Sequence, residues 1–178
     1  MMGERVVQIL QHYRHDLMNH LQIVQGYVGM RNIEKAEKKL GEIVDYYNEE
    51  RKLMSLNMPE FMIWIIQFNV RYENLRLTYK VHSEYKNLHV SDSILVKQFQ
   101  DFMERCVDIL NPEELYEVTL VIEESSDTSM KIMLSIPCKT DEAEQLMESI
   151  KKMQRDGAAE IVIAKTMVGL CFGLIISQ

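Results

Sequence analysis

The sequence predicts an α+β protein in which an N-terminal helical hairpin precedes a small α/β sandwich domain. Three features predict this order. Apolar residues near the start recur every three or four positions, as they do on one face of a helix. A second stretch with the same period follows after a short break. Beyond Pro59, which cannot continue a helix, short alternating runs typical of strands are mixed with helical segments. We therefore expect two domains, residues 1–57 and 58–178.

The first helix carries its apolar residues at the a and d positions of a heptad repeat, and only Arg14 interrupts this seam with a polar side chain. The apolar members are Val7, Leu10, Leu17, Leu21, Val24 and Val28. The pattern breaks between Gly29 and Asn32. Because asparagine favours helix N-caps, Asn32 is the predicted start of the next helix.

The second helix has its own apolar seam, and the short turn before it predicts an antiparallel hairpin. The seam consists of Ile33, Ala36, Leu40, Ile43 and Tyr47. Two helices alone cannot enclose two apolar seams. The usual remedy is to pair with a second copy in a four-helix bundle, so we expect a homodimer.

The second domain is expected to alternate between helices and strands. The predicted helices span residues 60–74, 91–110 and 142–155, and the predicted strands span residues 77–82, 117–123, 130–136, 161–164 and 167–176. Asn111-Pro112 stops the middle helix. The turn-rich residues 125–129 join two of the strands into a hairpin.

Composition limits the class of partner and the compartment. The 178 residues carry a formal net charge of −7, which argues against nucleic acid or an anionic membrane surface as the main partner. Three cysteines without metal-ligand spacing indicate reduced thiols. The start has no signal-peptide pattern, and the strongest apolar run, residues 167–176, is about half of the ~20 residues that a spanning helix needs. We expect a cytoplasmic protein.

One stripe of the first helix stands out chemically. His15, Asn19, Gln22 and Gly26 follow at steps of four, three and four residues, so they share one face. His15 is at a b position of the heptad and should point away from the core. A single exposed histidine on an amphipathic helix usually has no function. That is our interpretation of the other histidines, His12, His20, His82 and His89.

The residues around His15 favour a function for this histidine. Residues 14–22 read Arg-His-Asp-Leu-Met-Asn-His-Leu-Gln, which resembles the phosphoacceptor box of the sporulation-type two-component family. The chain is similar to the sporulation initiation phosphotransferase B family of the Bacillus group. The resemblance extends through the second helix and the Lys52–Pro59 connection into the second domain, and it fades thereafter.

The resemblance implies a phosphorelay phosphotransferase in sporulation initiation. His15 would accept a phosphoryl group from the aspartyl phosphate of one receiver domain, a single-domain response regulator, and pass it to a second, a transcription factor. Mg²⁺ would come from the receiver, since this chain shows no metal-binding cluster of its own. Asn19, Gln22 and Gly26 would form the docking face. Arg14 and Asp16 would assist the chemistry or be merely solvated, and the residues alone leave both alternatives open.

The second domain would be similar to the ATP-binding domain of sensor kinases, without its nucleotide site. Such sites need glycine-rich turns, because backbone must approach phosphates closely. The seven glycines of this chain include no Gly-x-Gly pair. Residues 137–141 read Pro-Cys-Lys-Thr-Asp where kinases resemble Asp-x-Gly-x-Gly, and the preceding helix offers Asp101 and Arg105 where a metal-binding asparagine pair is expected. Because arginine cannot ligate Mg²⁺, we expect no autokinase activity from ATP.

Two alternatives remain open on the sequence. A degenerate sensor kinase acting as a receiver phosphatase or scaffold would use the same helix face. A purely structural dimer, with an inert second domain, would make the His15 box accidental. The structural-dimer alternative does not explain Gly26, since glycine within a helix lowers helix stability by up to ~1 kcal/mol relative to alanine.

Overall fold

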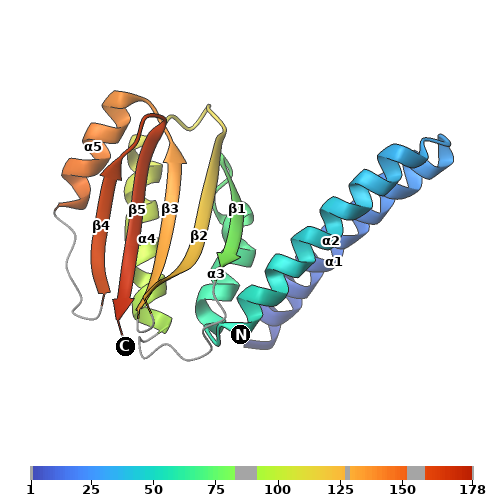
Figure 1. The fold of residues 1–178 in the computed structure, drawn as a ribbon, viewed down its shortest axis with the longest axis horizontal. Coiled ribbons are helices and arrows are strands. Elements are labelled where there is room, and N and C mark those ends of the chain that lie inside the picture. Colours follow the sequence, from blue (N-terminus) through green and yellow to red (C-terminus); the bar gives the residue numbers. More distant parts are fainter. Residues whose placement is uncertain (1, 83–91, 127–128, 152–158, 178) are drawn as a thin grey trace. The chain divides into compact units, whose positions relative to one another are not determined.

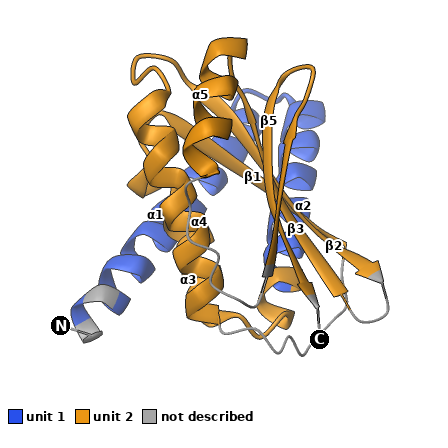
Figure 2. Ribbon diagram, turned by 90° about the vertical axis from the view of Figure 1, so that its left-hand side faces the viewer, with its two compact units in different colours: residues 1–51 blue, residues 52–178 orange. Residues whose placement is uncertain are grey.

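The structure is a computed structural model that describes residues 2–82, 92–126, 129–151 and 159–177 (Figure 1). The chain divides into two compact units, residues 1–51 and residues 52–178, which are coloured separately in Figure 2. The first unit is helical, and the second contains a five-stranded sheet with helices. The predicted α+β class, a helical hairpin followed by an α/β sandwich, is confirmed.

Two helices, α1 (Met2–Gly29) and α2 (Ile33–Ser55), form the hairpin. The turn between them closes with a bond from the Asn32 backbone N–H to the Tyr27 carbonyl at 2.9 Å, while Arg31 takes a left-handed conformation with φ of 55°. This geometry ends many helices. The predicted cap is present, because the Lys35 N–H donates to Asn32 Oδ1 at 3.1 Å.

The hairpin covers only part of the predicted apolar seams. On α2, Ala36, Ile43 and Glu50 are buried at intervals of seven residues, as expected for the side that faces a partner helix. On α1, the seam residues Leu17 and Val24 are half-buried. Tyr47 of the second seam is also half-buried. The remaining apolar seam positions stay exposed by 46% to 60%, namely Val7, Leu10, Leu21, Val28, Ile33 and Leu40.

The last turn of α2 packs with the second unit, because Leu53 and Leu56 are fully buried in its core. Helix α3 (Pro59–Arg71) begins at Pro59, one residue before the predicted start at residue 60, and Asp92 caps it by accepting the backbone N–H groups of Glu60 and Phe61. This helix ends three residues before the predicted residue 74, since Tyr72 is already extended and the first strand begins at Leu75.

The sheet has the strand order β1-β2-β3-β5-β4. Its members are β1 (Leu75–His82), β2 (Tyr116–Ser126), β3 (Ser129–Pro137), β4 (Ala159–Lys165) and β5 (Gly169–Ser177). β1 runs parallel to β2, and α4 (Asp92–Ile109) lies between them in sequence, as a parallel pair requires. The remaining pairs are antiparallel. Helix α5 (Thr140–Ile150) follows β3.

One face of the sheet packs against the helices, which lie behind the strands in Figure 1. Alternate residues of the central strands are buried, as in β3, where Met130, Ile132, Leu134 and Ile136 point into the core. The centre of this core is aromatic. Phe102 of α4 stacks on Phe172 of β5 with ring centroids 4.2 Å apart.

Other predicted boundaries in the second unit were also wrong, most clearly those of its last strand and last helix. The last strand begins at Gly169 rather than Met167, because residues 167 and 168 form the turn after β4 and are exposed. The helix predicted over residues 142–155 begins earlier, at Thr140, and ends at Ile150. Residues 152–155 of that prediction lie outside the described residues, as do residues 127–128 of the predicted turn. In the part of the chain that is described, no helix is both long and apolar enough to cross a membrane.

Candidate functional site

His15 lies midway along α1 on the exposed side of the helix, as its heptad position predicts. Its side chain is 71% exposed, and the carboxylate of Asp16 beside it is equally open. An imidazole in this position is accessible to a second macromolecule.

Two neighbouring side chains contact the same atom of the imidazole. Asp16 Oδ1 lies 3.3 Å from His15 Nδ1, and Asn19 Nδ2 lies 3.2 Å from that same Nδ1. The Asn19 contact follows from helical spacing, since the residue four positions later lies one turn along the same face, whereas Asp16 reaches the imidazole as the adjacent residue in the chain. Neither of these contacts engages Nε2, the nitrogen farther from the helix.

Of the other predicted site residues, Gln22 and Gly26 continue the stripe of His15 along the first helix, and Arg14 is at a seam position. Arg14, Gln22 and Gly26 are all exposed. Because α1 is continuous, the stripe extends about 16 Å from His15 to Gly26 at 1.5 Å per residue. A Cβ placed on Gly26 would meet no atom within 4 Å, so the fold of this chain does not itself require glycine there.

A buried carboxylate, that of Glu50, lies close to this site. The sequence analysis did not identify this residue. Glu50 of α2 is 3% exposed, and Tyr13, two residues before His15, is its neighbour. Burial raises the pKa of Glu50, and the Tyr13 hydroxyl offsets part of this rise. Burial, followed by the charge of Glu50, raises the pKa of Tyr13 to about 12. The signal in the sequence was the seven-residue interval that Glu50 shares with Ala36 and Ile43.

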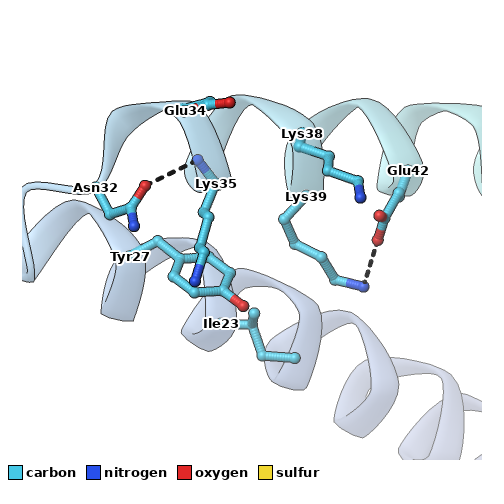
Figure 3. A pocket seen from close by; sticks show the side chains of 8 residues that line it. All are labelled: Ile23, Tyr27, Asn32, Glu34, Lys35, Lys38, Lys39 and Glu42. Carbon is cyan, nitrogen blue, oxygen red and sulfur yellow. Dashed lines mark hydrogen bonds and ion pairs between the residues drawn. The ribbon is translucent and has the colours of Figure 1, made fainter.

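A groove of about 540 Å³ lies between the two helices near the turn (Figure 3). It begins at Ile23, about 12 Å along α1 from His15. Its lining residues are Ile23, Tyr27, Asn32, Glu34, Lys35, Lys38, Lys39 and Glu42. The sequence analysis had not singled out these lysines.

Two of the three lysines in the groove have partners within it. The Lys35 ammonium lies 6.0 Å from the centre of the Tyr27 ring, and Lys39 Nζ contacts Glu42 at 3.0 Å, as the dashed line in Figure 3 marks. Among the described residues, Lys38 forms no ion pair. The groove therefore offers a cation and an aromatic surface to an acidic partner.

Residues 137–141, which the sequence analysis compared with a kinase glycine motif, lie at the start of helix α5. Lys139 precedes α5, and its backbone N–H donates to Glu142 Oε2 at 2.8 Å in a capping box. Glu142 is buried and also accepts the Tyr116 hydroxyl at 3.0 Å. The Lys139 ammonium pairs with Glu114. The polar groups of Lys139 and Glu142 therefore have their hydrogen-bond and ion-pair partners within this chain.

Arg105, at the position compared with a metal-binding asparagine, donates to Ser149 Oγ of α5 at 2.8 Å. Across the described ranges, no three histidine, cysteine, aspartate or glutamate side chains are grouped as metal ligands. The three cysteines are free thiols.

Comparison with known proteins gives matches to both units. Residues 2–56 match the family model of the alpha-helical domain of SpoOB-type sensor kinases. A curated relative is sporulation initiation phosphotransferase B of Bacillus subtilis (strain 168), 30% identical over 92 residues. That match covers 52% of this chain and 48% of the relative, so it spans about half the length of each protein.

Solved structures with a similar arrangement are histidine kinases of low sequence identity. The nucleotide-free catalytic domain of histidine kinase ThkA is 12% identical, with a TM-score of 0.49, over 70% of this chain and 94% of that one. Histidine kinase ThkA in complex with the response regulator protein TrrA is 13% identical, with a TM-score of 0.47, over 99% of this chain and 64% of that one.

Proposed function

We propose that the protein, whose residues 2–56 match the model of the SpoOB-type alpha-helical domain, is a phosphorelay phosphotransferase that carries a phosphoryl group on His15. It accepts the group from the aspartyl phosphate of one response-regulator receiver and passes it to the aspartate of a second, in sporulation initiation. The observation that carries the proposal is an exposed imidazole whose polar contacts both end at Nδ1.

The geometry supports attack by Nε2. When Nδ1 bears the proton and donates to Asp16, the lone pair on Nε2 is available. It forms a bond to phosphorus while the bond from phosphorus to the aspartyl oxygen breaks, and the receiver recovers a free carboxylate. The ring then carries positive charge, which the Asp16 carboxylate stabilises. Exposed Arg14 can lessen the negative charge on the transferring group. Transfer to the second receiver reverses these steps.

The partner surface consists of the exposed Asn19, Gln22 and Gly26 and continues into the groove near the turn. Receiver active sites are acidic, because they hold Mg²⁺ through carboxylates. Lys38 and Tyr27 of the groove suit such a partner. Mg²⁺ would enter with the receiver and neutralise the transferring group.

We also propose that the hairpin of a second copy of the chain packs against this hairpin. The exposed apolar positions of the seam, among them Leu10, Leu21 and Leu40, form more apolar surface than a hairpin usually leaves open to water. Two hairpins that bury these seams together make a four-helix bundle with two His15 sites. The bundle leaves His15 exposed because its b position points away from the seam.

The test is transfer of labelled phosphate from a purified, phosphorylated receiver domain to this protein without ATP. Label that is stable in base, labile in acid and absent from His15→Gln establishes a phosphohistidine at this residue. Since His15 is exposed, the variant should keep the wild-type circular dichroism and thermal transition.

The same experiment separates the alternatives. If free phosphate accumulates and the protein is never labelled, it acts as a receiver phosphatase. If two different receivers both keep their label, the His15 box is not a phosphoacceptor site and the inert structural dimer is favoured.

A further inference from the structure

The two contacts at His15 Nδ1 exclude one another. The Asn19 amide nitrogen can only donate a hydrogen bond, so its contact at 3.2 Å requires an unprotonated Nδ1 that accepts. The Asp16 carboxylate can only accept, so its contact at 3.3 Å requires a proton on Nδ1. A neutral imidazole has one ring proton and can satisfy only one of these neighbours at a time.

The choice between the neighbours decides whether His15 can attack phosphorus. When Nδ1 accepts from Asn19, the single ring proton is on Nε2, and Nε2 has no lone pair in the ring plane. When Nδ1 donates to Asp16, the proton is on Nδ1 and the Nε2 lone pair is free. The side chain is 71% exposed, so water can exchange the proton between the two nitrogens.

We propose that Asn19 is a positioning residue that holds His15 in the tautomer with the proton on Nε2, in competition with Asp16, and so limits the fraction of the resting protein able to accept a phosphoryl group. This inference rests on the proposed function of His15. Asn19 then controls the tautomer of His15 in addition to contacting a partner protein.

The direct test is the tautomer ratio of His15 in ¹⁵N-labelled protein, measured by long-range ¹H–¹⁵N correlation at a pH where the ring is neutral. Asn19→Ala removes the donor and should shift the ratio about threefold toward the Nδ1–H form, the effect of losing one weak, exposed hydrogen bond. Asp16→Asn should shift the ratio the other way. Gln8→Ala is the matched control, since Gln8 is exposed at the preceding b position of α1 and is seven residues from His15.

A second measurement uses phosphoramidate as the donor, which needs no docking face. Nε2 attacks its phosphorus, the P–N bond breaks, and ammonia leaves with a proton from water. Asn19→Ala should be labelled about threefold faster than the wild type, in step with its tautomer ratio. Gln8→Ala should be labelled at the wild-type rate.

An unchanged ratio in Asn19→Ala would overturn the proposal. So would a shift toward the Nε2–H form, because the Asn19 carbonyl would then be the group that faces a protonated Nδ1. Neither result bears on whether His15 is the carrier, because the tautomer is measured without any receiver. Failure of the receiver experiment, in turn, leaves the tautomer result intact.

Discussion

At the scale of single residues, exposed and buried ionisable side chains lie close together around His15. His15 and Asp16 are open to solvent, while Glu50 opposite Tyr13 is 3% exposed. A buried carboxylate is costly unless its oxygens are bonded. Neither oxygen of Glu50 has a hydrogen bond of ordinary geometry to a described residue. The hairpin therefore carries a destabilising group one turn from its reactive residue.

Glu50 makes the stability of the hairpin depend on pH. Its folded pKa is raised by burial, so the folded state binds the proton more tightly than the unfolded state. Stability is then complete below the unfolded pKa and is lost as pH rises through the raised folded value. We expect the thermal midpoint of the wild type to fall between about pH 4.5 and pH 7 by more than that of Glu50→Gln.

The measurement is thermal unfolding followed by circular dichroism across this pH range. At pH 7 the Glu50→Gln variant should be the more stable of the two, since it buries no charge. Glu49→Gln, at a neighbouring but less buried position, is the control. Parallel curves for wild type and Glu50→Gln would show that Glu50 is not desolvated in the folded protein.

At the scale of secondary structure, α1 has two distinct faces, the polar stripe that contains His15 and the apolar seam proposed for dimerisation. The exposed stripe from His15 to Gly26 faces solvent, while the seam residues Leu10, Leu21 and Val28 remain 46% to 60% exposed in a single chain. Burial of a leucine side chain contributes about 1.5–3 kcal/mol, so a second hairpin that covers this seam would be held strongly. The separation of the two faces allows dimerisation without covering the site.

The seam predicts the effect of a charge at its centre. Leu21→Glu should keep the chain monomeric if the proposed dimer forms through this seam, because the substitution would bury two carboxylates against each other. The mass in solution, measured by light scattering after gel filtration, should fall from twice the chain mass to the 21.0 kDa of one chain. Gln8→Glu, which adds the same charge at an exposed b position, should leave the dimer intact. A dimeric Leu21→Glu would show that the chains meet elsewhere.

At the scale of the whole molecule, the chain joins a hairpin that displays the proposed carrier His15 to a sandwich whose described residues contain no group of possible metal ligands. The start of α5 is fixed by the capping box of Lys139 and Glu142, and Arg105 is bonded to Ser149. These bonds occupy the positions that resemblance compares with the glycine motif and the metal-binding asparagine of kinases. They support our proposal that phosphate reaches His15 only from a receiver.

Addition of Mg²⁺ and γ-labelled ATP should therefore leave the purified protein unlabelled. A phosphorylated receiver should label the same preparation, which serves as the positive control for a folded, competent His15. The measurement is acid-labile, base-stable label on the wild type beside His15→Gln. Label from ATP on the wild type alone would mean that the second unit binds nucleotide despite its lack of Gly-x-Gly.

The sequence alone determined the features that depend on local pattern. Periodicity placed both helices of the hairpin, Asn32 capped the second as predicted, and Pro59 began α3. The b position of His15 correctly predicted an exposed imidazole. These features are local because helical spacing and backbone capping involve residues a few positions apart. The proposed role of His15 came from resemblance and its transfer chemistry still awaits its experiment.

Only the tertiary structure decided what depends on residues distant in sequence. The turn at Met167 and Val168 arises where β4 folds back to pair with β5, and α3 is capped by Asp92 from the start of another helix. The burial of Glu50 depends on packing between helices, and the groove depends on side chains from both α1 and α2. The contact of Asp16 and Asn19 with one nitrogen of His15 required rotamers that spacing alone cannot specify. Sequence pattern sets which face a residue occupies, whereas packing sets which atoms meet there.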